Sequence, residues 1–68
     1  MDKYIRILLI QLSKKYKITI INILTAKDNK TINIYKIIIK DNKDETRLSK
    51  DFYNKRDVVG ELMKWQKG

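Results

Sequence analysis

The sequence predicts a two-layer α+β domain, in which two helices pack on one face of a three-stranded antiparallel sheet in the order α–β–β–β–α. Three observations predict this fold. Apolar residues recur at helical spacing near both ends of the chain, and β-branched residues dominate its middle. Short polar turns separate the strand-like stretches, which favours a meander with both helices on one face. With 68 residues, we expect one small domain over residues 1–68.

Residues 2–16 are predicted to form the first helix. Its apolar face consists of Tyr4, Ile5, Leu8, Leu12 and Tyr16, at steps of three and four. On the opposite side, a basic stripe is formed by Lys3, Arg6, Ser13, Lys14 and Lys17. Ile10 falls inside this stripe, where burial by the helix alone would not place it. The stripe is either a solvated outer face or a binding surface.

The middle of the chain predicts two strands joined by a turn. "KITIINILT", residues 17–25, is rich in β-branched residues and too short for a second good helix. "AKDNK", residues 26–30, reads as a connection in which Asp28 and Asn29 suit tight backbone geometry. "TINIYKIIIK", residues 31–40, is the second strand.

The second strand changes its apolar phase along its length. Ile32 and Ile34 have one parity, whereas Tyr35, Ile37 and Ile39 have the other. This change predicts either a bulge or a sheet that is apolar on both faces. An apolar face without covering helices is a candidate surface for a homodimer.

The last third of the chain predicts a strand and a helix. "ETRLSKDF", residues 45–52, fits a third strand with Leu48 pointing inward. The final helix starts at Asn54, with Asp57 three residues later as in a capping box. Its buried face is predicted to contain Val58, Val59, Leu62 and Trp65, while Gly60 faces outward.

The composition excludes several classes of protein. Cysteine and histidine are both absent, which removes disulfides, the usual zinc sites and the common catalytic bases and nucleophiles. We therefore expect no enzymatic activity, no cofactor and no metal site. The apolar run Ile7–Ile10 is too short for a signal peptide or a membrane span. We expect a cytoplasmic protein that does not bind membranes.

The formal net charge is +8. Such an excess either indicates a polyanionic partner, most often a nucleic acid, or reflects the codon bias of an AT-rich genome. The start of the last helix adds a local signal, because Lys55 and Arg56 follow the cap directly. Cations are unfavourable at a helix N-terminus, and a docked phosphate would turn this cost into a gain.

The order α–β–β–β–α and two local motifs resemble the double-stranded RNA-binding domain family. "LLIQLSKKY", residues 8–16, is similar to the first helix of that family, with Gln11 where Glu is usual. "NKRDV", residues 54–58, is similar to its Ser-Lys-Lys-x-Ala motif, whose lysines hold phosphates. The chain departs from the family at Val59, where a third lysine is usual, and in "AKDNK", which lacks the Gly-Pro-x-His of the family's first hairpin.

This resemblance implies binding of double-stranded nucleic acid, with RNA favoured over DNA, by shape and phosphate contacts. Two regions, the first helix and the hairpin loop, would reach successive minor grooves, and the start of the last helix would hold the phosphates between them. The residues expected to bind are Lys3, Arg6, Gln11, Lys14, Lys27, Asn29, Lys30, Lys55 and Arg56.

Two alternatives stay open. Residues 35–65 resemble the arm-type DNA-binding domain of tyrosine integrases, in which a sheet face enters the DNA groove; Phe52 matches that pattern. The other alternative is a small dimeric protein-interaction module, acting as an inhibitor or regulator from a phage or another mobile element. The apolar second sheet face and Ile10 favour this interpretation.

Overall fold

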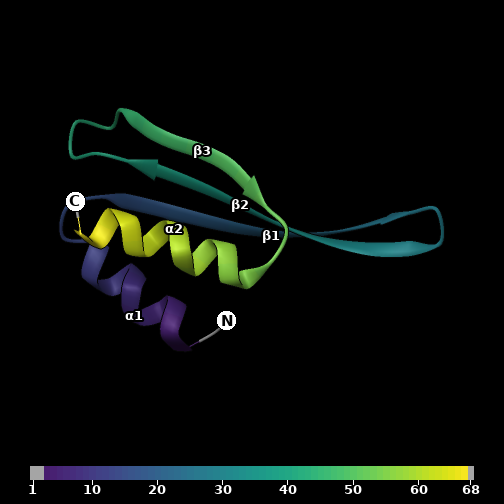
Figure 1. Cartoon of the computed structure of the whole chain (residues 1–68). Helices are drawn as coiled ribbons and strands as arrows, with labels where there is room; N and C mark the ends of the chain where they lie inside the picture. Colours follow the sequence, from purple (N-terminus) through teal and green to yellow (C-terminus); the bar gives the residue numbers. More distant parts are fainter. Residues whose placement is uncertain (1–2, 68) are drawn as a thin grey trace.

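The computed structural model describes residues 3–67 and has the predicted order of elements. The elements are α1 (Lys3–Leu12), β1 (Lys17–Lys27), β2 (Lys30–Lys40), β3 (Thr46–Phe52) and α2 (Lys55–Lys67). The three strands form an antiparallel sheet in the order β1-β2-β3. Both helices lie on one side of this sheet (Figure 1). The predicted α+β fold is therefore confirmed.

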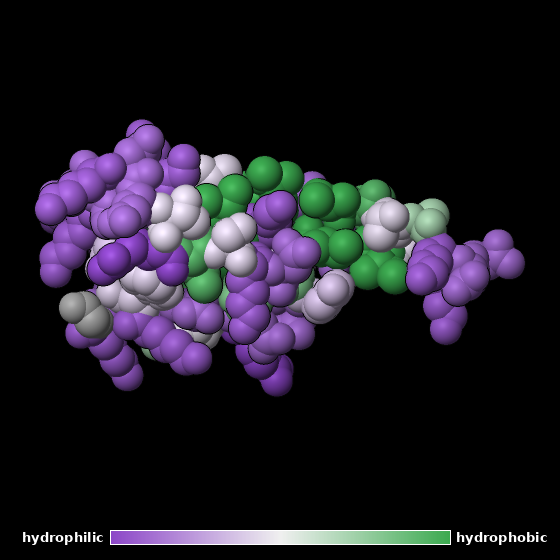
Figure 2. Space-filling view, turned by 90° about the horizontal axis from the view of Figure 1, so that it is seen from above, coloured by the Kyte–Doolittle hydropathy of each residue, from purple (hydrophilic) through white to green (hydrophobic). Residues whose placement is uncertain are grey.

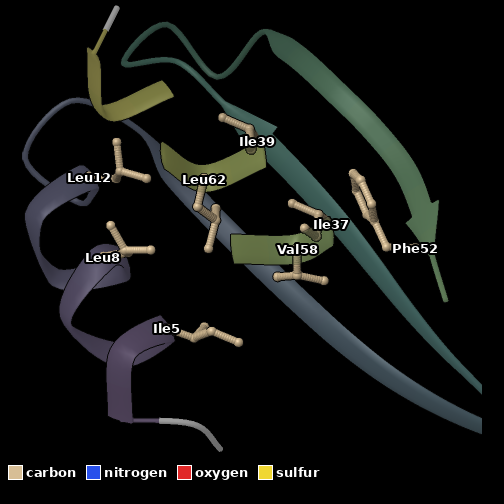
Figure 3. Packing of buried hydrophobic residues seen from close by; sticks show 8 residues of the cluster. All are labelled: Ile5, Leu8, Leu12, Ile37, Ile39, Phe52, Val58 and Leu62. Atoms are coloured by element: carbon tan, nitrogen blue, oxygen red, sulfur yellow. The ribbon is translucent and has the colours of Figure 1, made fainter. Parts of the chain in front are cut away.

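The core lies between the two helices and the body of the sheet. Leu62 of α2 sits at its centre, between α1 and β2 (Figure 3). Burial of each aliphatic side chain stabilises the fold by about 1.5–3 kcal/mol. The buried residues are Ile5, Leu8 and Leu12 from α1, Ile37 and Ile39 from β2, Phe52 from β3, and Val58 and Leu62 from α2. The sequence pattern predicts the inward direction of the helix residues in this set, whereas it assigns no direction to Ile37, Ile39 or Phe52.

The first helix is shorter than the predicted range 2–16. It ends at Leu12, and the hydroxyl of Ser13 donates a hydrogen bond to the carbonyl oxygen of Ile10 at 2.6 Å. A serine that bonds to the preceding turn competes with the helical backbone bonds. Lys14 therefore lies in a turn and does not extend the basic stripe of the helix, contrary to the sequence prediction.

Trp65 belongs to the structural core, as the sequence predicts. Its ring meets the ring of Tyr16 edge to face, with centroids 5.2 Å apart and planes at 85°. Its indole nitrogen donates to the carboxylate of Glu61 at 3.1 Å. Both needs of a tryptophan, apolar contact and a partner for its N–H, are met within the domain.

The β1–β2 hairpin extends well beyond the body of the domain (Figure 1). These strands pair in continuous register from Lys17–Lys40 to Lys27–Lys30, whereas β3 pairs with β2 only as far as Tyr35. Residues 23–34 therefore form a two-stranded ribbon, here called the arm. At about 3.4 Å per residue, its five residues per strand project by roughly 17 Å.

The tip of the arm is tighter than the predicted connection at residues 26–30. Only Asp28 and Asn29 lie in the loop, with φ angles of 52° and 61°. Two successive residues at positive φ are the signature of a type I′ turn, whose twist matches that of the strands. Lys27 and Lys30 are consequently the last residues of their strands and lie opposite each other.

The change of apolar phase in β2 does not come from a bulge against β1. The β1–β2 register is uninterrupted, and the one irregularity recorded for β2 lies at its far end, opposite β3 between Ile39 and Lys40. Because Ile37 and Ile39 point to the helices, their neighbours point away from them. The sheet is thus apolar on both faces, the second of the two predicted possibilities.

We call the helix-free side of the sheet the open face. Seen from above in Figure 2, apolar side chains gather from the middle of the molecule along the arm, with hydrophilic residues at the tip. Alternation along the paired strands places one set of isoleucines on this face. The set comprises Ile21, Ile23, Ile32, Ile34 and Ile38; the first three are exposed and the last two are half-buried.

Candidate nucleic-acid interface

The start of α2 is capped by its own side chains. The backbone N–H of Asp57 donates to Oδ1 of Asn54 at 2.8 Å, and Nδ2 of Asn54 donates to Oδ2 of Asp57 at 3.0 Å. The first bond confirms Asn54 as the predicted cap, and the second replaces the return bond of a capping box, because Asp57 accepts from the side-chain amide of Asn54 and not from its backbone N–H. Lys55 and Arg56 occupy that turn and are exposed.

The charges of this turn are only partly balanced. Asp57 is the single acidic residue of the first turn and faces the positive end of the helix dipole favourably. Within residues 3–67, the recorded ion pairs include neither Lys55 nor Arg56. The turn therefore presents two unpaired cations together with the partial positive charge of the helix end, an arrangement that suits an anion.

The first turn of α1 lies at the same end of the molecule. Figure 1 shows α1 and α2 running side by side in the same direction, with both N-termini towards the arm. At their other ends, Nε2 of Gln66 donates to Oε1 of Gln11. Lys3 and Arg6 are exposed on α1, so the fold brings these two predicted residues to the end that also carries Lys55 and Arg56.

The outward side of α1 is not purely basic. Ile7 and Ile10 are exposed there, Ile10 to 66%, and they alternate with Lys3 and Arg6. The prediction that Ile10 lies outside the core is confirmed. Gln11, by contrast, is turned towards α2 by its hydrogen bond to Gln66.

The tip of the arm carries a second group of predicted residues. Lys27 and Lys30 face each other across the last pair of the hairpin, and Asn29 lies in the turn between them. Like charges directly opposite each other are destabilising in a hairpin. Neither lysine is in an ion pair in the part of the chain that is described, so the tip is a second site that an anion would stabilise.

The two ion pairs recorded for residues 3–67 lie at the opposite end of the domain. Nζ of Lys17 lies 3.7 Å from Oδ1 of Asp44, and Nε of Arg47 lies 3.8 Å from Oδ2 of Asp41. The carboxylate of Asp41 also accepts the backbone N–H groups of Lys43 and Glu45, at 2.9 and 3.0 Å. The acidic residues here hold the β2–β3 turn together.

Lys14 belongs to this paired end. It lines a shallow hollow between residues 13–18 and residues 41–44, which also contains Asp41 and Asp44. The structure thus divides the predicted site. Lys3, Arg6, Lys55 and Arg56 share one end of the helix layer, and Lys27, Asn29 and Lys30 share the arm tip. Gln11 and Lys14 lie apart from both groups.

The length of the arm is the functional feature that sequence reasoning missed. The signal for it was the pair Asp28–Asn29, because a two-residue loop pairs every residue up to Lys27 and Lys30.

Among residues 3–67, no group of three or more acidic, histidine or cysteine side chains is placed to hold a metal ion. No helix of this part of the chain is long and apolar enough to cross a membrane.

Comparison of the chain with protein-family models, curated proteins and solved structures found no match. The resemblances described above therefore rest on the element order and the quoted residues alone, and function has to be argued from the geometry and the charges of the surface.

Proposed function

We propose that the protein binds double-stranded nucleic acid, and RNA in preference to DNA, through phosphate contacts. The observation that carries this proposal is the uneven pairing of charge. Asp41 and Asp44 each lie within ion-pair distance of a cation at one end of the domain, whereas no ion pair recorded for residues 3–67 includes the exposed cations of the arm tip or of the two helix starts. A surface of this kind attracts a polyanion and fits no small neutral ligand.

The start of α2 is the central phosphate contact in this proposal. Asn54 accepts the N–H groups of Asp57 and Val58, so a phosphate at this helix end would meet the N–H groups of Lys55 and Arg56 together with their side chains. The phosphates across a narrow A-form major groove can be reached in this way, without any contact to bases. α1 then lies on the adjacent minor groove with Lys3 and Arg6 towards the backbone.

The arm supplies the second half of the contact. It projects by roughly 17 Å beyond β3, so its tip reaches a part of the duplex that the helices do not. A phosphate between Lys27 and Lys30 would relieve their mutual repulsion. Binding at two separated places favours a duplex over a flexible single strand, because a duplex keeps the distance between its phosphates fixed.

The alternative in which a sheet face enters a DNA groove finds less support. Residues that are paired across the strands form rows on the open face. In the three rows that contain Ile21, Ile23 and Ile32, Lys36 is the one cation, and Asp51 beside it is acidic. Aliphatic side chains provide no hydrogen bonds to base edges. The helix side and the arm tip are the surfaces that fit nucleic acid best.

The proposal is tested by titrating matched duplex RNA, duplex DNA and single-stranded RNA at several salt concentrations, with fluorescence anisotropy as the readout. We expect the tightest binding to duplex RNA, without sequence preference. Changing Lys55→Ala and Arg56→Ala together should weaken binding and reduce the slope of log K against log salt by about two, since about one counterion is released per phosphate contact.

The matched control changes Lys64→Ala and Lys67→Ala, which removes the same charge from the last turn of the same helix. If both double variants lose affinity and slope equally, the attraction depends on net charge alone and the phosphate site at the start of α2 is refuted. A preference for duplex DNA would refute the proposed choice of RNA.

A further inference from the structure

The open face carries exposed isoleucines that no helix of residues 3–67 covers. Ile23 is 42% exposed and Ile21 43% exposed, although both lie in regular strand structure. Two of the strands continue into the arm, where a two-stranded ribbon has no third strand or helix to support it. Such a ribbon is marginally stable in water by itself, which indicates that another surface packs against it.

The middle of this face offers little to a nucleic acid, because its further cations lie only in the end rows, at Lys17 with Lys40 and at Lys27 with Lys30. Its central row consists of Ile21, Lys36 and Asp51, which are neighbours in register. One cation and one anion side by side leave this row without net charge. The rows on either side are aliphatic or hydroxyl-bearing, for example Thr19 with Ile38, so a polyanion gains little here.

A second copy of the same chain fits the face. In a two-fold interface each surface meets itself. An axis along the central row therefore sets Lys36 of one copy against Lys36 of the other, and Asp51 against Asp51, with the opposite charges side by side and no net charge in the cluster. With the arms pointing in opposite directions, the row of Ile23 and Ile34 in each copy covers the row of Thr19 and Ile38 in the other.

Outside the central row, the cations of the overlapping rows meet uncharged rows, although each chain has a net charge of +8. Lys17 and Lys40 would lie over the row of Thr25 and Ile32, where their aliphatic stems can pack while the ammonium groups stay in water. Both arm tips overhang the interface and remain accessible at opposite ends of the pair.

The area is sufficient for a weak dimer. From strand spacings of about 4.8 Å and a rise of about 3.4 Å per residue, the overlapping rows cover roughly 400 Å² of flat area per copy. Side chains project from the face, so its accessible surface is larger than its flat area. The accessible surface buried on both copies together approaches roughly 1,200 Å², the lower limit for stable protein–protein interfaces. We infer that the protein forms a two-fold dimer through the open face, with a dissociation constant in roughly the micromolar range.

The test is the molar mass in solution, measured by sedimentation equilibrium from about 1 μM to about 1 mM protein. The wild-type chain should pass from 8.2 kDa towards twice that mass. Ile23→Lys places a charge in the interface and should raise the dissociation constant at least about tenfold. Leu24→Lys is the matched control, because Leu24 is the adjacent residue of the arm, is 68% exposed and points to the opposite face.

Three outcomes would overturn the proposal: a monomer over the whole range, equal effects of Ile23→Lys and Leu24→Lys, or an Ile23→Lys variant that dimerises like the wild type. Circular dichroism of each variant establishes that it is folded before its mass is interpreted. The Lys55→Ala/Arg56→Ala variant should dimerise normally, so failure of the dimer and failure of nucleic-acid binding are separate results.

Discussion

Gly60 is the residue at which the structure makes the simplest prediction about stability. It lies in the interior of α2, faces solvent, and a Cβ atom built there meets nothing within 4 Å. Alanine is favoured over glycine at such a position by about 1 kcal/mol, because glycine loses more backbone entropy on folding. Gly60→Ala should therefore raise the free energy of unfolding by about that amount, measured by urea denaturation.

The control for this change is Val58→Ala in the same helix, which also alters helix propensity but opens a space in the core, where Val58 is 1% exposed. It should lower stability. If Gly60→Ala left the urea midpoint unchanged or lowered it, the glycine would be required by a contact outside the monomer.

The structural position of a single residue can be predicted from the sequence where residues close to it in the chain determine that position. The cap at Asn54 and Asp57 needs only a spacing of three, and the exposure of Ile10 follows from its angular position on the helix. The prediction for Lys14 is wrong because α1 ends at Leu12, two residues before it. The hydroxyl of Ser13 bonds to the carbonyl of Ile10 at this helix end, and the periodicity of the sequence does not reveal that bond.

At the scale of elements, the arm explains both the success and the failure of sequence reasoning. The β-branched residues predict the strands, yet Ala26, Lys27 and Lys30 are predicted to lie in the connection because they flank the turn-forming Asp28 and Asn29. Cross-strand pairing, set by the positive φ angles of Asp28 and Asn29, overrides that local preference. Register is a property of two strands, so a pattern within one strand cannot supply it.

The arm should also differ from the body in local stability. Hydrogen bonds of residues 23–34 are exposed and lack a third strand, so they open by fraying, whereas those around Ile37 and Ile39 open only with the whole domain. In dilute, monomeric protein, the bonded arm amides should exchange with deuterium at least about a hundredfold faster than the amides of Ile37 and Ile39. Equal protection of both groups would contradict this separation.

The whole molecule has two surfaces of opposite character. The helix starts and the arm tip carry unpaired cations, whereas the open face is apolar with a balanced pair at Lys36 and Asp51. A small basic chain gains solubility and polyanion attraction from the first surface and can gain stability from burying the second. A dimer would place one arm tip at each end, so both functions can operate in the same assembly.

Salt should act on these two functions in opposite directions. Added salt should weaken the proposed nucleic-acid binding, because counterions released into a more concentrated salt solution gain less entropy. With about six phosphate contacts, affinity should fall by roughly a thousandfold between about 50 and about 200 mM salt. Dimerisation brings together two chains of charge +8, and their repulsion is screened over a distance of about 10 Å at about 0.1 M salt. The dimer should therefore tighten by a few-fold over the same range. One salt series, read by anisotropy with duplex RNA and by sedimentation without it, measures both trends. A dimer that dissociates as salt rises would show that ionic contacts, not the isoleucines of the open face, hold it together.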